Sequence, residues 1–347
     1  MSDDRTLQVA IVGYGLGGAA FHAPVIDATP GLDVAAVVTS DPDRSAAAAA
    51  RYPSATVVPS ADDAWALAGR LDIAVLATPN RTHVPLGLAA LDAGLHVVVD
   101  KPLAAFADDA RRLIDAARDR DRVLTVYQNR RWDGDFLTLR RLLDDGALGE
   151  VYRLESRFEG WRPVPKPGWR QDPAPEEAGG LLYDLGAHLI DQAILLFGPV
   201  RDVYAEVDRR RDGARVEDDV FLALTHDADV RSHLWMNKIA AGRGPRFRVL
   251  GSGGTWTKHG LDPQEARLRA GGDPSEPGFG EEPESAWGTL HDGRESRRVP
   301  TEPGRYTAFY AALAEAVRGE GAPPVDPAAA VAVLEVIEAA LGQADAR

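Results

Sequence analysis

Short apolar runs recur through the first third of the chain, and stretches with helical patterning separate them. The runs read LQVAIV, LDVAAVVT, ATVVP, IAVLAT, HVVVD and VLTVY. Strands that alternate with helices in this way predict right-handed β-α-β crossovers and therefore a parallel sheet. The alanine run at residues 45–50 fits one of these helices, because alanine has the highest intrinsic helix propensity. The pattern indicates a doubly wound α/β domain.

The pattern changes after Gln128. Residues 136–143 have the spacing of an amphipathic helix that Gly146 ends, and VYRLESRFEG alternates like a half-exposed strand. VEDDVFLALTHDADVRSHLWMN reads as two strands joined at 226–229, which predicts antiparallel pairing. Residues 271–300 are rich in Gly, Pro and Glu and are expected at the surface. Two helices, at 304–318 and 326–343, are expected to close the chain.

Length and composition limit the possible classes of protein. A chain of 347 residues is long for one hydrophobic core, so we expect two domains, at 1–127 and 128–347. No segment reads as a membrane span, and the acidic start MSDDRTLQ is unlike a signal peptide, so a cytoplasmic location is expected. The net charge of −14 disfavours binding to nucleic acid or to anionic membranes, and it favours a small-molecule partner.

The cysteine and histidine content limits the chemistry. The sequence contains no cysteine, which excludes disulfides, thiolate zinc sites, iron-sulfur clusters and cysteine nucleophiles. Its eight histidines lack the spacing of metal ligands, so no metal site is expected.

A glycine-rich segment follows the first apolar run. Gly13, Gly15 and Gly18 form a G-x-G-x-x-G set that contains Leu16 and joins the strand-like run 7–12 to a helical pattern. A dinucleotide pyrophosphate binds at such a turn, because bare backbone and a helix N-terminus face it. Tight turns also collect glycines for purely structural reasons. The strand-turn-helix context favours a cofactor site.

The end of the second apolar run faces the adenosine ribose in a dinucleotide-binding fold. If that strand ends at Thr39, the small hydroxyls of Thr39 and Ser40 take the discriminating positions, and Arg44 can meet a 2′-phosphate. NADP(H) then fits better than NAD(H). In the alternative interpretation Asp41 accepts the ribose 2′-hydroxyl of NAD(H), or caps the following helix.

Two further segments follow strands of the predicted sheet: Ala-Thr-Pro-Asn at 77–80 and Asp-Lys-Pro at 100–102. Doubly wound sheets bind ligands at the carboxyl ends of their strands, where both segments lie. Lys101 could be an ordinary solvated charge. Its place after an apolar run and before a proline that fixes the turn favours a side chain aimed at a ligand.

The segment GGLLYDLGAHLID at 179–191 carries candidate acid-base chemistry in the second domain. If a helix begins near Tyr183, Asp184 and His188 stand at i and i+4 on one face. Histidine suits proton exchange near neutral pH, and a carboxylate can orient it or bind substrate. The two glycines ahead of the helix would let the backbone approach a flat ring. The alternative is a buried histidine that a helical neighbour satisfies.

A loop rich in Pro and Trp, at 160–178, precedes this helix and is a candidate substrate-side loop. Trp161, Arg162, Trp169 and Arg170 would give it an aromatic and guanidinium surface that suits a polyhydroxylated ring. Loop packing with solvated arginines is the alternative interpretation.

Together these motifs resemble the glucose-fructose oxidoreductase / inositol dehydrogenase / MocA family. The matching elements, in chain order, are the glycine loop running into FHAP at 21–24, ATPN at 77–80, DKP at 100–102, GGLLYDLGAHLID at 179–191, GLDPQE at 260–265, and Y-x-x-FY at 306–310 leading to PPV at 323–325. The likeness covers the whole chain in the right order.

The resemblance implies an N-terminal Rossmann domain and a C-terminal α/β domain with a large open, mostly antiparallel sheet. The strands between 151 and 250 would form this sheet, with a helix at 184–197 on its inner face. Its outer face would make a homodimer or a dimer-based oligomer. The resemblance also implies hydride transfer between nicotinamide and a sugar, polyol or related carbonyl.

In this reaction Lys101 would contact the reacting oxygen and the cofactor, Asp184 would hold a substrate hydroxyl, and His188 would move the proton. One departure from the family pattern is Asp100, which is one methylene shorter than the usual Glu before Lys-Pro. Lys101 is expected to keep its place, whereas the partner of this carboxylate is left open.

The expected cofactor-binding residues are Gly13, Gly15, Leu16, Gly18, Thr39, Ser40, Arg44, Thr78, Pro79, Asn80, His83, Asp100 and Lys101. The expected substrate-binding residues are Lys101, Trp161, Arg162, Trp169, Asp184 and His188.

Within the family, FHAP, the Thr-Ser pair after the second strand and GLDPQE look most like the NADP-dependent scyllo-inositol dehydrogenase branch. The leading hypothesis is an NADP-dependent oxidoreductase that acts on a neutral cyclic polyol, a sugar or a related ketone. A non-catalytic dinucleotide sensor is a second hypothesis, which the retention of Lys101, Asp184 and His188 disfavours. A reductase of non-carbohydrate carbonyls is a third.

Overall fold

The computed structural model describes residues 5–345 and divides the chain into two compact units. Unit 1 contains residues 1–129, 264–279 and 305–331, and unit 2 contains residues 130–263, 280–304 and 332–347. The first crossing therefore falls two residues after the expected boundary at 127. Two later segments return to unit 1, whereas the sequence analysis placed every residue from 128 onward in the second domain. The two units are described separately below.

Unit 1 is built on a parallel sheet, as expected. Its strands are β1 (Leu7–Val12), β2 (Leu32–Val38), β3 (Thr56–Val58), β4 (Ile73–Leu76), β5 (His96–Asp100) and β6 (Leu124–Tyr127). They lie in the order β3-β2-β1-β4-β5-β6, and every pair is parallel. This is the strand order of the doubly wound dinucleotide-binding fold, in which ligands bind where the order reverses beside β1.

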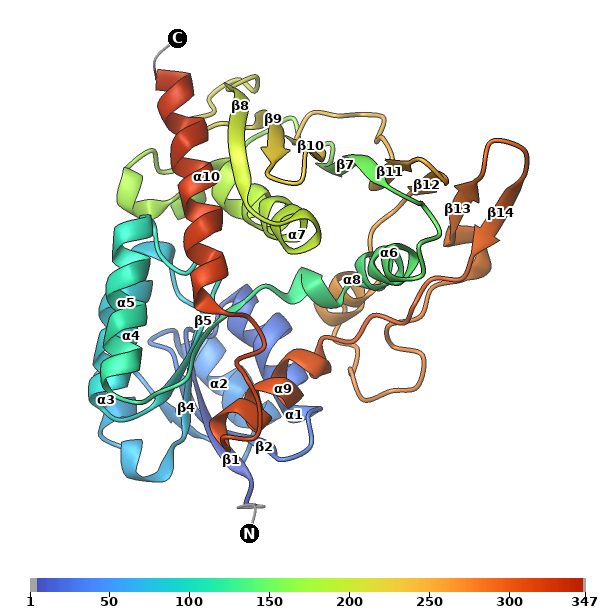
Figure 1. Ribbon diagram of the computed structural model, residues 1–347. Coiled ribbons are helices and arrows are strands. Elements are labelled where there is room, and N and C mark those ends of the chain that lie inside the picture. Colours follow the sequence, from blue (N-terminus) through green and yellow to red (C-terminus); the bar gives the residue numbers. More distant parts are fainter. Residues whose placement is uncertain (1–4, 346–347) are drawn as a thin grey trace. The chain divides into compact units, whose positions relative to one another are not determined.

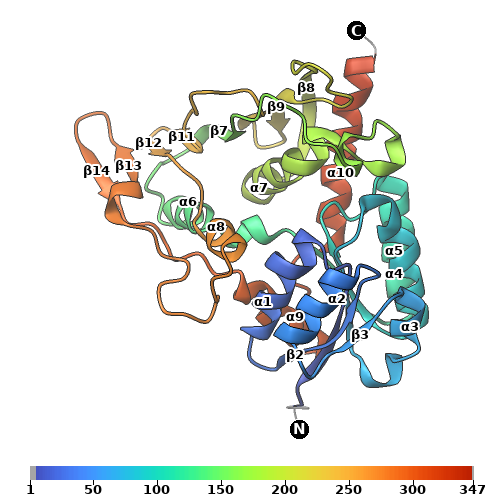
Figure 2. The same cartoon turned by 180° about the vertical axis from the view of Figure 1, so that it is seen from behind.

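Helices cover both faces of this sheet (Figures 1 and 2). They are α1 (Ala23–Asp27), α2 (Pro42–Arg51), α3 (Ala61–Trp65), α4 (His83–Asp92), α5 (Ala107–Asp119) and α9 (Thr307–Val317). Unit 1 also contains α8 (Gln264–Arg269), which contacts the helical turn at Gly17–His22. Helix α1 packs against β2 and α9, and α4 packs against β5 and α5. The central strands are therefore buried on both faces, and Ile11, Val75 and Val98 have no exposed surface. A parallel sheet needs this cover, which explains the continuous apolar runs.

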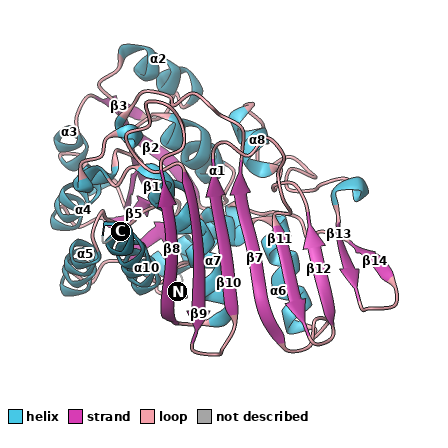
Figure 3. Cartoon of the chain, turned by 90° about the horizontal axis from the view of Figure 1, so that it is seen from above, coloured by secondary structure: helices cyan, strands magenta, loops and turns pink. Residues whose placement is uncertain are grey.

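Unit 2 contains one open sheet of eight strands (Figure 3). Its strands are β7 (Val151–Glu159), β8 (Val200–Asp208), β9 (Asp219–His226), β10 (Arg231–Asn237), β11 (Phe247–Gly251), β12 (Gly254–Lys258), β13 (Gly288–His291) and β14 (Ser296–Val299). They lie in the order β14-β13-β12-β11-β7-β10-β9-β8. Only β7 and β10 pair in parallel, so the sheet is mostly antiparallel.

Burial alternates along the central strands of this sheet, so that one face is covered and the other is open. In β9, Val220, Leu222 and Leu224 are buried, while the residues between them are half-buried. Helix α7 (Ala187–Phe197) lies on the covered face against β7 and β10, and α6 (Gly134–Asp144) lies on the same side. Unit 2 also contains the C-terminal end of helix α10 (Pro327–Asp345), where Gln343 bonds to the backbone of β8.

Two segments add detail to the fold that the sequence analysis expected. Residues 271–300, which were expected at the surface, contain strands β13 and β14, which the sequence analysis did not predict. No membrane span was expected, yet Pro175–Phe197 and Pro327–Ala344 are long and apolar enough to cross a membrane by length and composition. Of the most apolar window of each, 67% and 39% respectively are buried inside the protein, so the first is mostly buried, as in a core helix.

Candidate active site and cofactor site

The glycine-rich loop joins β1 to the first helical segment of unit 1, a π-helical turn at Gly17–His22. Gly13 has a φ of +96°, and a Cβ there would lie 2.6 Å from the Ala77 carbonyl oxygen. A Cβ on Gly18 would overlap the Gly13 carbonyl oxygen. These two glycines are therefore required by the packing of the loop on its own neighbours.

Gly15 is different. The nearest atom to a Cβ at this position would be Nη1 of Arg44, 3.7 Å away. The protein's own packing would tolerate a side chain there. The absence of one leaves bare backbone, which fits the close approach of a pyrophosphate between the loop and the helix that follows. Neighbouring Leu16 is 54% exposed.

The end of β2 lies one residue earlier than the sequence analysis placed it, at Val38. Thr39 and Ser40 follow the strand directly. Asp41 caps helix α2 by accepting a hydrogen bond of 3.0 Å from the Arg44 backbone N–H, and its other oxygen lies 3.7 Å from Nε of Arg44. The structure thus shows Asp41 as the cap of α2, through one of its two carboxylate oxygens. Its carboxylate is engaged within α2, and the Arg44 guanidinium lies near Gly15.

The ends of β4 and β5 are tied together by a buried histidine. His83 has no exposed surface, and its ring nitrogens lie 2.8 Å from the Pro102 carbonyl oxygen and 3.0 Å from that of Thr78. Burial lowers the pKa of His83. Because both ring nitrogens face backbone carbonyls, the geometry favours a role in holding these loops rather than direct contact with a cofactor. Asn80 is also buried, and Pro79 precedes it at the start of a short 3-10 turn.

Asp100 and Lys101 lie at the end of β5. Oδ1 of Asp100 accepts a hydrogen bond of 2.8 Å from the Lys101 backbone N–H, and Oδ2 would lie 3.2 Å from a Cβ on Gly17. Burial opposes ionisation of Asp100, but His22 and the charge of Lys101 outweigh it and lower the pKa of this carboxyl below its usual value. Lys101 is half-buried. The strand end thus presents an ionised carboxylate beside the glycine-rich loop.

In unit 2, the helix that carries Asp184 and His188 begins at Gly180 rather than near Tyr183, and residues Leu182–Gly186 form a π-helical turn. Asp184 lies in this turn and its side chain is 31% exposed, while His188 lies in α7 and is 6% exposed. Single π-helical turns inside α-helices are frequent at functional sites. The chain has two such turns among its described residues, and both carry candidate site residues.

The two glycines ahead of this helix do not leave room for a flat ring, which corrects the sequence analysis. A Cβ on Gly179 would lie 2.9 Å from the Arg170 carbonyl oxygen, and one on Gly180 would overlap the Glu217 carboxylate. Glu217 accepts a hydrogen bond of 3.0 Å from the Leu182 backbone N–H, at the start of the helix. Burial raises the pKa of Glu217 to about 7, and the backbone donors only partly offset this.

The loop at 160–178 reaches Asp184 through one of its arginines. Nε of Arg170 lies 3.7 Å from Oδ1 of Asp184, and its guanidinium stacks on the ring of Trp169 at 4.3 Å. Trp161 is 57% exposed and forms a bridge with Ile239, and the Arg162 backbone N–H bonds to the Lys238 carbonyl. The structure therefore brings Trp169 and Arg170 to Asp184, whereas Trp161 and Arg162 are anchored at the start of the loop.

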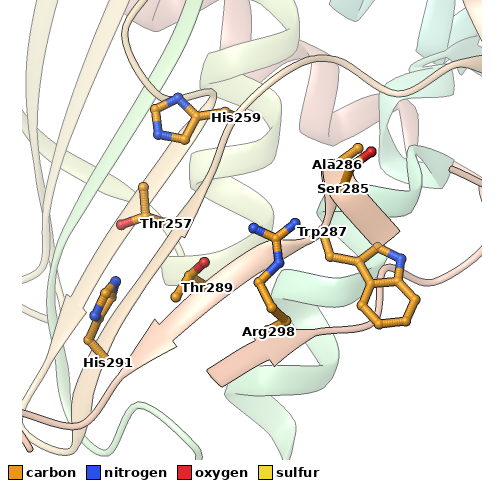
Figure 4. A pocket seen from close by; sticks show the side chains of 8 residues that line it. All are labelled: Thr257, His259, Ser285, Ala286, Trp287, Thr289, His291 and Arg298. Carbon is orange, nitrogen blue, oxygen red and sulfur yellow. The ribbon is translucent and has the colours of Figure 1, made fainter. Parts of the chain in front are cut away.

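A pocket of about 310 Å³ lies on the open side of the second sheet near β12, β13 and β14 (Figure 4). It is lined by Thr257, His259, Ser285, Ala286, Trp287, Thr289, His291 and Arg298. None of the expected site residues lines it. Within residues 5–345, no group of three or more histidine and carboxylate side chains could hold a metal ion.

Comparison with known proteins agrees with the fold and the motifs. Residues 7–128 match the family described as "Oxidoreductase family, NAD-binding Rossmann fold", and residues 136–257 match the "GFO/IDH/MocA C-terminal domain". The chain is 40% identical over 349 residues to the uncharacterized oxidoreductase YdgJ of Escherichia coli, covering 100% of this chain and 98% of that protein.

It is also 33% identical over 340 residues to the scyllo-inositol 2-dehydrogenase (NADP(+)) IolW of Bacillus subtilis, covering 97% of this chain and 93% of that protein. The solved structure of yvaA from Bacillus subtilis superimposes with a TM-score of 0.91 at 32% identity and covers 98% of this chain and 97% of that one. The chain therefore belongs to the GFO/IDH/MocA family of NAD(P)-binding oxidoreductases.

Proposed function

We propose that this protein is an NADP-dependent oxidoreductase of a neutral cyclic polyol, a sugar or the corresponding ketone. The observation that carries the proposal is the bare backbone at Gly15. The packing of the protein would tolerate a side chain at this position, and the nearest atom to its Cβ would be Nη1 of Arg44, 3.7 Å away. The similarity to a scyllo-inositol 2-dehydrogenase (NADP(+)) along nearly the whole chain supports the substrate class.

The preference for NADP(H) rests on the end of β2. Thr39 and Ser40 leave room for a 2′-phosphate, and Arg44 would meet its charge through a charge-assisted hydrogen bond. The carboxylate of Asp41 already accepts the Arg44 N–H as a helix cap. Asp41 is therefore poorly placed to accept a hydrogen bond from the ribose 2′-hydroxyl, which is the role of the acidic residue in NAD-binding versions of this fold.

The residues proposed for catalysis are Lys101, Asp184 and His188. A bound nicotinamide supplies or accepts the hydride. Lys101 binds the reacting oxygen, Asp184 holds a neighbouring substrate hydroxyl, and His188 exchanges the proton of the reacting hydroxyl. Histidine suits this step near neutral pH.

The charges near Asp184 favour a neutral substrate. Arg131 forms a two-pronged pair with the buried Asp191, and Arg130 lies 3.3 Å from Asp133, so both are engaged within the protein. The nearby Arg170 faces Asp184 itself. A dianionic phosphate beside Asp184 would lack compensation, whereas several hydroxyls could bond to Asp184, His188 and loop donors at once.

Turnover compared with binding separates an enzyme from a cofactor sensor. We expect NADPH oxidation with at least one ketose or inosose in a panel, together with NADPH binding detected by fluorescence. NADPH binding without turnover on the whole panel would favour the sensor, and turnover of diketones alone would favour a reductase of non-carbohydrate carbonyls.

A further inference from the structure

Two motifs that the sequence analysis used only as marks of resemblance meet in the core of unit 1. His22, from FHAP, has no exposed surface, and its ring lies 4.3 Å from that of Tyr127. Tyr310, from Y-x-x-FY, is 288 residues away in the sequence and equally buried. Phe309 completes the ring cluster against Tyr127 and Tyr310.

His22 and Tyr310 share a hydrogen bond. The Tyr310 hydroxyl lies 2.5 Å from Nδ1 of His22. Burial, and then the nearby Tyr127 and Asp100, raise the pKa of this hydroxyl well above its usual value, so Tyr310 keeps its proton. Tyr310 can therefore donate to Nδ1, which leaves the ring proton of a neutral His22 on Nε2.

The other ring nitrogen faces Asp100. Nε2 of His22 is buried without a hydrogen-bond partner, and it lies 3.9 Å from Oδ2 of Asp100. The second oxygen of this carboxylate accepts the Lys101 backbone N–H. The polar groups thus form a line from Tyr310 through His22 and Asp100 to the backbone of Lys101.

The residue that follows Lys101, Pro102, also faces a buried histidine. The carbonyl oxygen of Pro102 lies 2.8 Å from Nδ1 of the buried His83. Lys101 therefore stands between two residues whose polar atoms face buried histidines, His22 on one side and His83 on the other. A core that only needed apolar packing would not place a buried ring nitrogen without a bonded partner opposite a carboxylate.

We propose that the buried Tyr310 and His22, together with the half-buried Asp100, form a polar chain that positions Lys101 for the reaction. His22 and Tyr310 are positioning residues in this proposal, because they act through Asp100 and do not touch the substrate. The gap between Nε2 and Oδ2 is wider than a hydrogen bond by about one ångström, so one more methylene on residue 100 would nearly close it. The proposal rests on the proposed function, since it assigns these residues to the same reaction.

The test compares Tyr310→Phe with Tyr127→Phe. Both variants remove one buried hydroxyl from the same ring cluster, but the Tyr127 hydroxyl donates to the Phe21 carbonyl and not to His22. We expect Tyr310→Phe to lower kcat about tenfold while KM and the Kd of NADPH change less than twofold, because the lost bond acts on the reacting group and not on binding. Tyr127→Phe should keep kcat within about twofold. Equal kcat values in the two variants would overturn the proposal.

A second measurement does not need turnover. Ring ¹⁵N NMR, with the His22 signals identified by their loss in His22→Gln, is expected to show the proton on Nε2 and a bare Nδ1. A proton on Nδ1 would mean that Tyr310 accepts rather than donates, which would overturn the chain. If the wild-type protein turned over no substrate yet showed the expected tautomer, the proposed function would fail while the polar chain stood.

Substitutions of Asp100 add a conservative variant to the test. Asp100→Asn should lower kcat by about tenfold, and Asp100→Glu should retain it within about twofold, because glutamate keeps the charge and reaches toward His22. Circular dichroism checks that every variant is folded. Full activity of a folded Asp100→Asn variant would contradict the proposal.

Discussion

At the residue scale, we expect cofactor choice to depend on the charge that follows β2. The Arg44 side chain is 55% exposed, and its guanidinium lies near Gly15. Its Nε is 3.7 Å from Oδ2 of Asp41, which is too far for a hydrogen bond. Arg44→Ala is therefore expected to weaken NADP(H) binding about tenfold or more, since each charge-assisted bond contributes roughly 1.5–3 kcal/mol. The affinity for NAD(H) should hardly change. Titration of both cofactors by fluorescence measures this.

Arg51→Ala is the matched control, because Arg51 lies in the same helix and contacts the ring of Tyr52. Equal loss of NADP(H) affinity in both variants, or tighter binding of NAD(H) by the wild-type protein, would show that Arg44 does not meet a 2′-phosphate.

Also at the residue scale, Lys101→Met and His188→Asn should each lower kcat by about 10² to 10⁴-fold, which is the usual loss when a general acid or base is removed. The affinity of His188→Asn for NADPH should remain close to wild type, because the proposed role of His188 is on the substrate. Single-turnover kinetics with a saturating substrate measures the effect. Near wild-type kcat in His188→Asn at neutral pH would assign the proton transfer to another group.

Sequence patterns predicted individual residues unevenly, for physical reasons. The glycine-rich turn between the first strand and the first helical segment could be predicted, because strand, turn and helix are contiguous in the sequence. The roles of Gly179 and Gly180 could not, because their space is taken by Glu217 and by the loop at 160–178. The bond between His22 and Tyr310 joins residues that no local pattern relates.

At the scale of elements, the helix that carries Asp184 and His188 is expected to respond to pH through Glu217. The pKa of this buried carboxyl is raised to about 7, so the folded state favours its protonated form. Its contribution to stability is complete below the ordinary glutamate pKa of about 4.5 and is lost as the pH rises through about 7. The loss is on the order of 3 kcal/mol.

Urea unfolding at pH 5 and pH 8 measures this effect. Wild type should lose more free energy of unfolding between the two pH values than Glu217→Gln, which carries no titrating group. Glu176→Gln, an exposed position on the neighbouring loop, is the control and should behave like wild type. The same pH dependence in wild type and Glu217→Gln would contradict the assignment.

The elements themselves were predicted where their apolar periodicity is strong. Their observed bounds are close to the expected ones for the strands of unit 1, for β7, β9 and β10 of unit 2, and for the two C-terminal helices. Strands β13 and β14 were missed because they are short and lie at the sheet edge, and β14 reads Ser-Arg-Arg-Val, with no apolar alternation. The helical segment that carries Asp184 and His188 begins at Gly180, earlier than expected, and it passes through a π-helical turn before α7.

At the scale of the whole molecule, the open face of the second sheet is expected to form a homodimer. Phe221 and Trp235 are cross-strand partners on this face with ring centroids 5.0 Å apart, and Tyr204 beside them is 46% exposed. Apolar surface of this kind favours association. Light scattering at micromolar concentration should give the mass of a dimer or a dimer-based oligomer, and Tyr204→Glu should weaken it. A monomer for the wild-type protein would contradict the prediction.

The central claim concerns the substrate, and the comparison of kcat/KM across a substrate panel tests it most directly. The panel contains scyllo-inositol, myo-inositol and their ketones beside glucose 6-phosphate and simple 2-hydroxy acids, each with both cofactors. We predict the highest kcat/KM for a neutral cyclic polyol or its ketone with NADP(H), because Asp184 would repel an anion and the guanidinium of Arg170 already faces Asp184. A tenfold or greater preference for a phosphorylated or acidic compound would contradict the account and would place Arg170 and Arg162 at the substrate.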